Sequence, residues 1–110
     1  MISSDVIRGH IDTIILKLLM EKDMYGYELA NEISLRTKNK FDIKEATLYA
    51  VVQRLEMKNL IQSYMGEKSH GGKRRYYKVT PFGRAYYSET ISEWKLLKEI
   101  MMAILGSDIS

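Results

Sequence analysis

Apolar residues recur at intervals of three and four in the first part of the chain, and this spacing predicts three helices. The first spans residues 5–21, where Ser3, Ser4 and Asp5 offer side-chain oxygens that can cap its start. The second follows a polar turn at residues 23–26 and runs to about residue 38, and the third covers residues 44–58. The inward face of the third helix comprises Leu48, Val51, Val52 and Leu55.

From residue 60 the spacing of apolar residues changes to every second position, which is typical of a half-exposed strand. A second strand is predicted over residues 73–79. The segment between them, GEKSHGG, contains a glycine pair that can adopt positive φ, so the two strands are expected to form a hairpin with a fairly long loop.

The last predicted element is a long helix from Pro81 to about Leu105, capped by Thr80. Three short helices, a hairpin and one long helix indicate a mainly α fold with a small β-hairpin, the arrangement of a winged helix-turn-helix. We expect residues 1–80 to form the winged domain and residues 81–110 to form a C-terminal dimerisation helix.

The outward face of the 44–58 helix combines small residues with a few long polar ones. Alanines let a helix approach a DNA groove closely, while Gln and Arg can read adenine and guanine edges. An ordinary solvent-facing helix of good helix formers is the alternative interpretation. The candidate DNA-binding residues on this helix are Thr47, Tyr49, Ala50, Gln53 and Arg54.

Positive charge concentrates around the hairpin loop and the start of its second strand. Phosphates are the natural partners of such a cluster, although basic residues also protect exposed strand edges from aggregation. The candidate phosphate-binding residues in the hairpin are Lys68, His70, Lys73 and Arg74.

The 81–105 helix carries an apolar stripe that is longer than a small winged domain can cover, which predicts packing against a second copy of the chain. A homodimer would also place two reading helices on half-sites related by two-fold symmetry. The predicted interface residues are Tyr87, Ile91, Leu97, Met101 and Ile104, with Trp94 in the middle of the stripe.

Composition adds mainly exclusions. The net charge of +3 permits DNA binding without establishing it, and the lack of cysteine excludes disulfides and thiolate metal sites. Only His10 and His70 could supply imidazole, so no metal or cofactor is expected. No catalytic constellation is visible, which argues against an enzyme. The N-terminal region does not have the pattern of a signal peptide or membrane span, so we expect a cytoplasmic protein.

Five short motifs are spread over nearly the whole chain: Tyr25-Gly26-Tyr27-Glu28, Thr47-Leu48-Tyr49, Arg54-Leu55-Glu56, Leu60-Ile61 and RRYYKVTPFG at residues 74–83. In this order and spacing they resemble the PadR family of bacterial transcriptional regulators. The short chain and single C-terminal helix resemble a small subfamily that is similar to the multidrug-sensing repressors of lactic acid bacteria. Asn59 stands where the family usually has glycine, and Asn tolerates the left-handed backbone well enough to end the helix there.

The resemblance implies a dimeric repressor that binds a double-stranded operator and is relieved by a planar aromatic ligand. Trp94 matches a tryptophan that lines a pore at the dimer centre, where it stacks on such ligands. A plain interface anchor is the alternative role. Lys98 stands where the multidrug sensors have an acidic residue, and Asp12 could restore acidity if it faces the pore. A winged-helix module that binds proteins rather than DNA is the alternative function.

Overall fold

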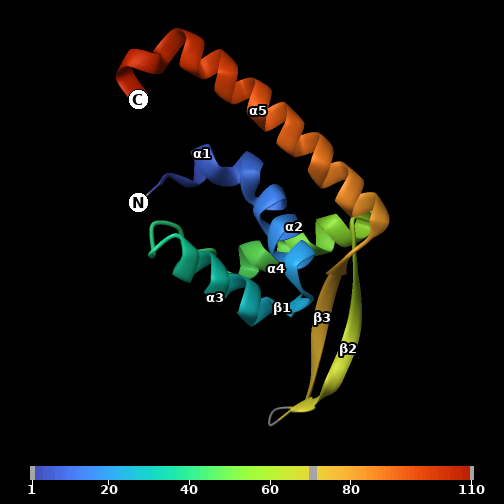
Figure 1. The fold of residues 1–110 in the computed structure, drawn as a ribbon. Coiled ribbons are helices and arrows are strands. Elements are labelled where there is room, and N and C mark those ends of the chain that lie inside the picture. Colours follow the sequence, from blue (N-terminus) through green and yellow to red (C-terminus); the bar gives the residue numbers. More distant parts are fainter. Residues whose placement is uncertain (1, 70–71, 110) are drawn as a thin grey trace.

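The computed structural model describes residues 2–69 and 72–109. At the N-terminus, α1 (Ser4–Ile7) leads through a 3-10 turn, η1 (Arg8–His10), into α2 (Ile11–Glu21). The single helix predicted over residues 5–21 is therefore interrupted before Ile11. The interruption lets the N-terminal turns bend away from the α2 axis (Figure 1).

The helix-turn-helix pair consists of α3 (Gly26–Arg36) and α4 (Glu45–Met57). The backbone N–H of Tyr25 donates to Glu28 Oε1 over 3.3 Å and caps the start of α3. At the other end, Lys38 and Asn39 have φ of 52° and 62°, a left-handed conformation that ends the helix. The predicted ends of these two helices lie within about two residues of those observed.

The wing consists of β2 (Ile61–Ser69) and β3 (Gly72–Val79), which pair in antiparallel fashion. Both strands extend into the segment predicted as a loop, because Lys68 pairs with Lys73 and Ser69 with Gly72 in backbone register. An irregularity between Met65 and Lys68 accommodates this extension.

A short strand, β1 (Met24–Tyr25), pairs with the outer edge of β3. The described part of the sheet therefore has the order β1-β3-β2. This strand was missed in the sequence because its two residues lie in a polar segment with turn character. Met24 is buried, so β1 joins the helix-turn-helix to the wing through the core as well as through hydrogen bonds.

The core lies where α2, α3 and α4 meet the base of the sheet. The apolar faces predicted for the helices point inward, as helical spacing requires. The largest fully buried side chains include Ile15, Leu16, Leu19, Met24, Leu29, Leu48, Leu55, Leu60 and Ile61.

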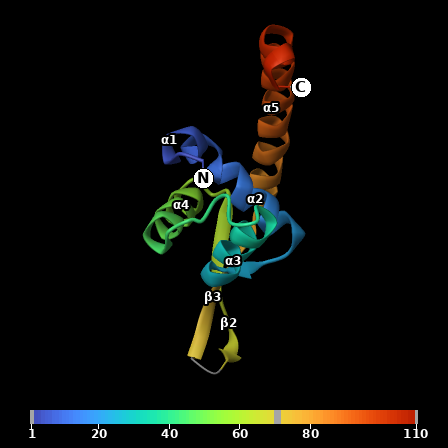
Figure 2. The same cartoon turned by 90° about the vertical axis from the view of Figure 1, so that its left-hand side faces the viewer.

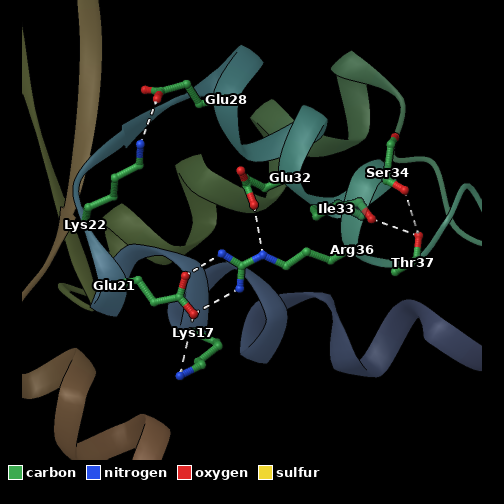
Figure 3. Close-up of polar contacts among 9 residues, drawn as sticks. All are labelled: Lys17, Glu21, Lys22, Glu28, Glu32, Ile33, Ser34, Arg36 and Thr37. Carbon is green, nitrogen blue, oxygen red and sulfur yellow. Dashed lines mark hydrogen bonds and ion pairs between the residues drawn. The ribbon is translucent and has the colours of Figure 1, made fainter.

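An exposed ion network joins α2 to α3 (Figure 3). The Arg36 guanidinium donates to both oxygens of Glu21, at 2.9 and 2.5 Å, and its Nε donates to Glu32 at 2.8 Å. These hydrogen bonds lower the pKa of Glu21 below its usual value. The two-bonded contact fixes the angle between α2 and the first helix of the helix-turn-helix pair.

The C-terminal helix α5 (Pro81–Ile109) begins beside the sheet and continues beyond the winged domain (Figures 1 and 2). Its start is anchored by Thr80, whose hydroxyl accepts from the N–H of Gly83 at 2.9 Å and donates to the carbonyl of Asn59 at 2.7 Å. Thr80 thus caps α5 and ties it to the end of α4, as its position before Pro81 suggests. Among the described residues, no helix is long and apolar enough to cross a membrane.

Candidate DNA-binding interface

The outward face of α4 is open to solvent and carries small and polar side chains, together with the exposed Met57 at the C-terminal end of the helix. Leu48, Val51, Val52 and Leu55 point into the core, which fixes the rotation of the helix. The structure brings together on the opposite side the candidates Thr47, Tyr49, Ala50, Gln53 and Arg54, all of them exposed.

Tyr49 lies between α4 and the start of α3. A Cβ added at Gly26 would stand 3.1 Å from its hydroxyl, so the ring rests directly on the glycine. The side chain is 47% exposed, and its hydroxyl forms no hydrogen bond to another described residue. Tyr49 is therefore positioned by packing, with its polar end available to a partner.

Arg54 has a contact that its sequence position did not reveal. Its Nη2 donates to Oδ1 of Asp12, in the first turn of α2. Asp12 was a candidate for the ligand site, but its carboxylate faces α4 in this structure. Sequence spacing carries no signal for a pair that is 42 residues apart.

Arg74 and Lys73 are exposed at the free half of the wing. The guanidinium of Arg74 lies over the ring of Tyr25, 4.4 Å from its centroid, in a cation–π contact. Tyr25 in turn packs edge-on against Tyr76, which stacks on Tyr64. Through these ring contacts, the side chain of Arg74 lies close to the start of α3. The Lys68 backbone pairs with Lys73, and His70 lies outside the described residues.

Arg75 belongs to the same basic cluster in the sequence but points to the other face of β3. Its Nη1 donates to the hydroxyl of Ser63 over 3.1 Å, and that hydroxyl donates to Glu56 Oε2 over 2.6 Å. Because Glu56 belongs to α4, these hydrogen bonds connect the wing to α4. The sequence signal that could have found them is the alternation of side chains along β3, which separates Arg75 from Arg74.

Two open hollows border the α4 face. One has a volume of about 360 Å³ and lies between α4 and the wing; it is lined by Tyr25, Gly26, Tyr49, Arg74, Arg75 and Tyr77. The other, of similar volume, lies between α4 and the N-terminal turns and is lined by Arg8, Ile11, Ala46, Thr47, Ala50, Val51 and Arg54. Arginine side chains thus lie on both sides of α4. Arg8 joins the candidate residues, although the sequence did not suggest it.

The far part of α5 exposes an apolar surface. Tyr87 packs against the core of its own chain, whereas Trp94, Leu97, Met101 and Ile104 remain exposed by 48, 46, 42 and 78%. An apolar hollow of about 360 Å³ separates the middle of α5 from the N-terminal helices. It is lined by Ile2, Val6, Ile7, His10, Thr13, Ile14, Ile91 and Trp94.

Acidic and imidazole side chains do not gather into a metal-binding cluster anywhere in residues 2–69 and 72–109. The helix-turn-helix, the sheet pairing and the open α4 face instead define a winged helix-turn-helix DNA-binding protein.

Comparison with known proteins gives the family. Residues 15–89 match the model of the transcriptional regulator PadR-like family, and the chain belongs to that family. An uncharacterized protein of Lysinibacillus sphaericus is 60% identical over 101 residues, covering 92% of this chain and 93% of its own. Members are transcriptional regulators that bind DNA, so the protein is a DNA-binding regulator and not an enzyme.

Solved structures of transcriptional regulators are similar to this chain in sequence and in fold. A transcriptional regulator from Clostridium thermocellum is 47% identical with a TM-score of 0.86, covering 96% of this chain and 99% of its own. A PadR family transcription regulator from Clostridium difficile is 40% identical with a TM-score of 0.77, covering 88% and 99% of the two chains. These similarities confirm the winged fold with its long C-terminal helix.

Proposed function

We propose that the protein is a homodimeric transcriptional repressor whose operator binding is relieved by a small planar aromatic ligand held beside Trp94. The observation that carries the proposal is the division of the molecule into an open polar α4 face and an uncovered apolar half of α5. The first is suited to a DNA groove and the second to another copy of the chain. Such a regulator would act in the cytoplasm, where it meets DNA.

The dimer is supported by what α5 leaves exposed. A contiguous apolar surface on a helix that its own domain does not cover favours association with a similar surface. Leu97, Met101 and Ile104 are spaced by four and three residues and so share one face. Two copies joined through α5 would present their α4 helices symmetrically, as a palindromic operator requires.

DNA contact is assigned to α4 and the wing together. The small side chains Ala46 and Ala50 let α4 approach the major groove, where Gln53 and Arg54 would reach base edges. Lys73 and Arg74 would meet phosphates beside that groove, because the wing emerges from the same side of the core.

The operator assignment is tested by selecting binding sites from a random duplex pool and measuring affinity for the selected site. We expect the combined substitutions Gln53→Ala and Arg54→Ala to weaken operator binding about tenfold or more, and binding to random duplex only about two- to threefold through the lost positive charge. Lys95→Ala on α5 is the matched control. Unchanged operator affinity in the double variant would show that α4 does not read the sequence.

The ligand assignment rests on the hollow next to Trp94. Its lining is apolar, and the half-exposed indole offers a face on which a flat ring can stack. Asp12 is not among the lining residues because its carboxylate is paired with Arg54. Lys98 lies one helical turn beyond Trp94 and forms no ion pair with another described residue. We therefore expect a neutral or anionic ligand.

Quenching of Trp94 fluorescence by cationic, neutral and anionic planar aromatics tests this assignment. We expect saturable quenching at micromolar concentrations with the neutral or anionic members, and release of operator DNA by the same compounds. Trp94→Ala should lose binding in calorimetry, whereas Trp94→Phe should retain part of it. Release of DNA by no compound in the panel would leave Trp94 as an anchor of the dimer.

A further inference from the structure

The pair formed by Arg54 and Asp12 lies at the edge of the DNA-reading face. Nη2 of Arg54 donates to Oδ1 of Asp12, while Nε and Nη1 donate to no other described residue. The Asp12 side chain is 20% exposed and that of Arg54 is 46% exposed. One edge of the guanidinium is therefore held, and its remaining donors are open to solvent.

Asp12 is the fixed member of this pair. It lies in the first turn of α2, where the helix dipole favours a carboxylate. Its neighbours Ile11 and Ile15 are buried in the core, so the backbone that carries it has little freedom to move. Since α2 also packs against α4, the carboxylate has a set position relative to the reading helix.

A fixed carboxylate changes what a flexible arginine can do. A free arginine samples many rotamers, and ordering its side chain on binding costs conformational entropy. The guanidinium is a planar fork, so a single hydrogen bond along one edge already restricts the direction in which its other donors point. Arg54 lines the same hollow as Thr47 and Ala50, on the face assigned to the major groove.

We infer that Asp12 is a positioning residue that orients Arg54 for a two-bond contact with a guanine edge, and so sets sequence specificity although it does not itself read a base. This inference rests on the assignment of Arg54 to the DNA surface. Because the Asp12 carboxylate also repels nearby phosphates, it disfavours placements in which Arg54 has no base partner. Both effects raise the ratio of operator binding to non-specific binding.

The test is Asp12→Asn, which keeps the shape of the side chain and removes its charge. We expect affinity for the selected operator to fall about three- to tenfold, affinity for random duplex to rise about two- to threefold, and the preference for guanine to relax at one position in each half-site. In an Arg54→Ala background, Asp12→Asn should no longer change that base preference. Glu89→Gln, which neutralises an exposed carboxylate on α5, is the matched control for loss of one negative charge.

The outcomes separate the two levels of the argument. An equal rise in affinity for both duplexes in Asp12→Asn, with base preference intact, would mean a general charge effect and overturn the inference while leaving the reading role of Arg54 in place. If Arg54→Ala leaves base preference unchanged, the assignment of Arg54 to DNA reading fails and the inference fails with it. Thermal melts of each variant exclude loss of folding as the cause.

Discussion

The backbone of Gly83, in the first turn of α5, lies so close to Leu60 that a Cβ at position 83 would stand 2.1 Å from the Leu60 carbonyl oxygen. That oxygen already accepts the Thr80 N–H at 3.0 Å and the Thr80 hydroxyl at 3.1 Å. The residue before β2, the residue after β3 and the start of α5 therefore meet at one point, in backbone-to-backbone contact.

Gly83→Ala should destabilise the protein strongly, by about 2 kcal/mol or more, because neither backbone can withdraw without breaking these bonds. Thermal unfolding at fixed protein concentration measures the loss. Gly106→Ala is the control on the same helix, since its Cβ would meet only Met102 Cε at 3.9 Å. That substitution should be neutral or stabilise the helix by up to about 1 kcal/mol. Equal stability of the two variants would contradict the close approach.

Asn59 ends α4 with φ of 62°, as expected for an asparagine in place of glycine at this position. Asn59→Ala should destabilise the fold by about 1 kcal/mol, because a Cβ-bearing residue without a short polar side chain disfavours this backbone region. Asn59→Gly should cost little or stabilise. Urea unfolding of both variants checks this, with Asn31→Ala in α3 as an exposed asparagine control. A more stable alanine than glycine variant would refute the backbone explanation.

Tyr64 on the wing donates its hydroxyl to Asp23 Oδ2 over 2.6 Å. This hydrogen bond raises the pKa of Tyr64 from the usual 10.0 to about 12. Because the folded pKa is the higher one, the bond stabilises the fold fully below about pH 10, and the contribution is lost as pH rises through about 12.

Absorbance titration of tyrosinate should therefore show a late-titrating phenol that Tyr64→Phe removes and that Asp23→Asn shifts back toward pH 10. Burial also raises the pKa of Tyr77, so Tyr64→Phe is needed to assign the signal. Loss of a tyrosinate that titrates near pH 10 in that variant would contradict the hydrogen bond.

The wing residues Lys73 and Arg74 should contribute mainly non-specific affinity. Replacing either by Ala should weaken binding to operator and random duplex alike, and should reduce the slope of log affinity against log salt by about 1. Tyr25→Leu should produce a smaller effect in the same direction, because Arg74 loses the ring on which it rests. Binding titrations at several salt concentrations measure the slope, with Lys95→Ala as the control. An unchanged slope in both wing variants would mean that the wing does not meet phosphates.

The sequence predicts well those parts of the fold that local periodicity determines. The apolar spacing around Leu48 and Leu55 places α4 and its rotation correctly, and Thr80-Pro81 marks the start of α5. The interruption at η1 was missed because the apolar spacing continues across it. The pairing of β1 with β3 was missed because two residues carry no period.

The candidate site likewise contains residues that local spacing predicts and contacts that it does not predict. The open face of α4 follows from helical geometry once the inward face is known, so Gln53 and Arg54 could be named from the sequence. The residues that hold the Arg54 and Arg74 side chains could not be predicted from the sequence. Asp12 beside Arg54 and Tyr25 beneath Arg74 come from distant segments, and only tertiary packing brings them together.

The attachment of α5 also makes the helix a lever. Its 29 residues extend for about 43 Å, and its base is clamped against Leu60. If two such levers join at their far halves, a rotation of only about 5° at the clamp would displace one end relative to the other by about 4 Å, close to the rise of one base pair in DNA. A ligand would need to change the angle of α5 only slightly to take one reading helix out of register with its half-site.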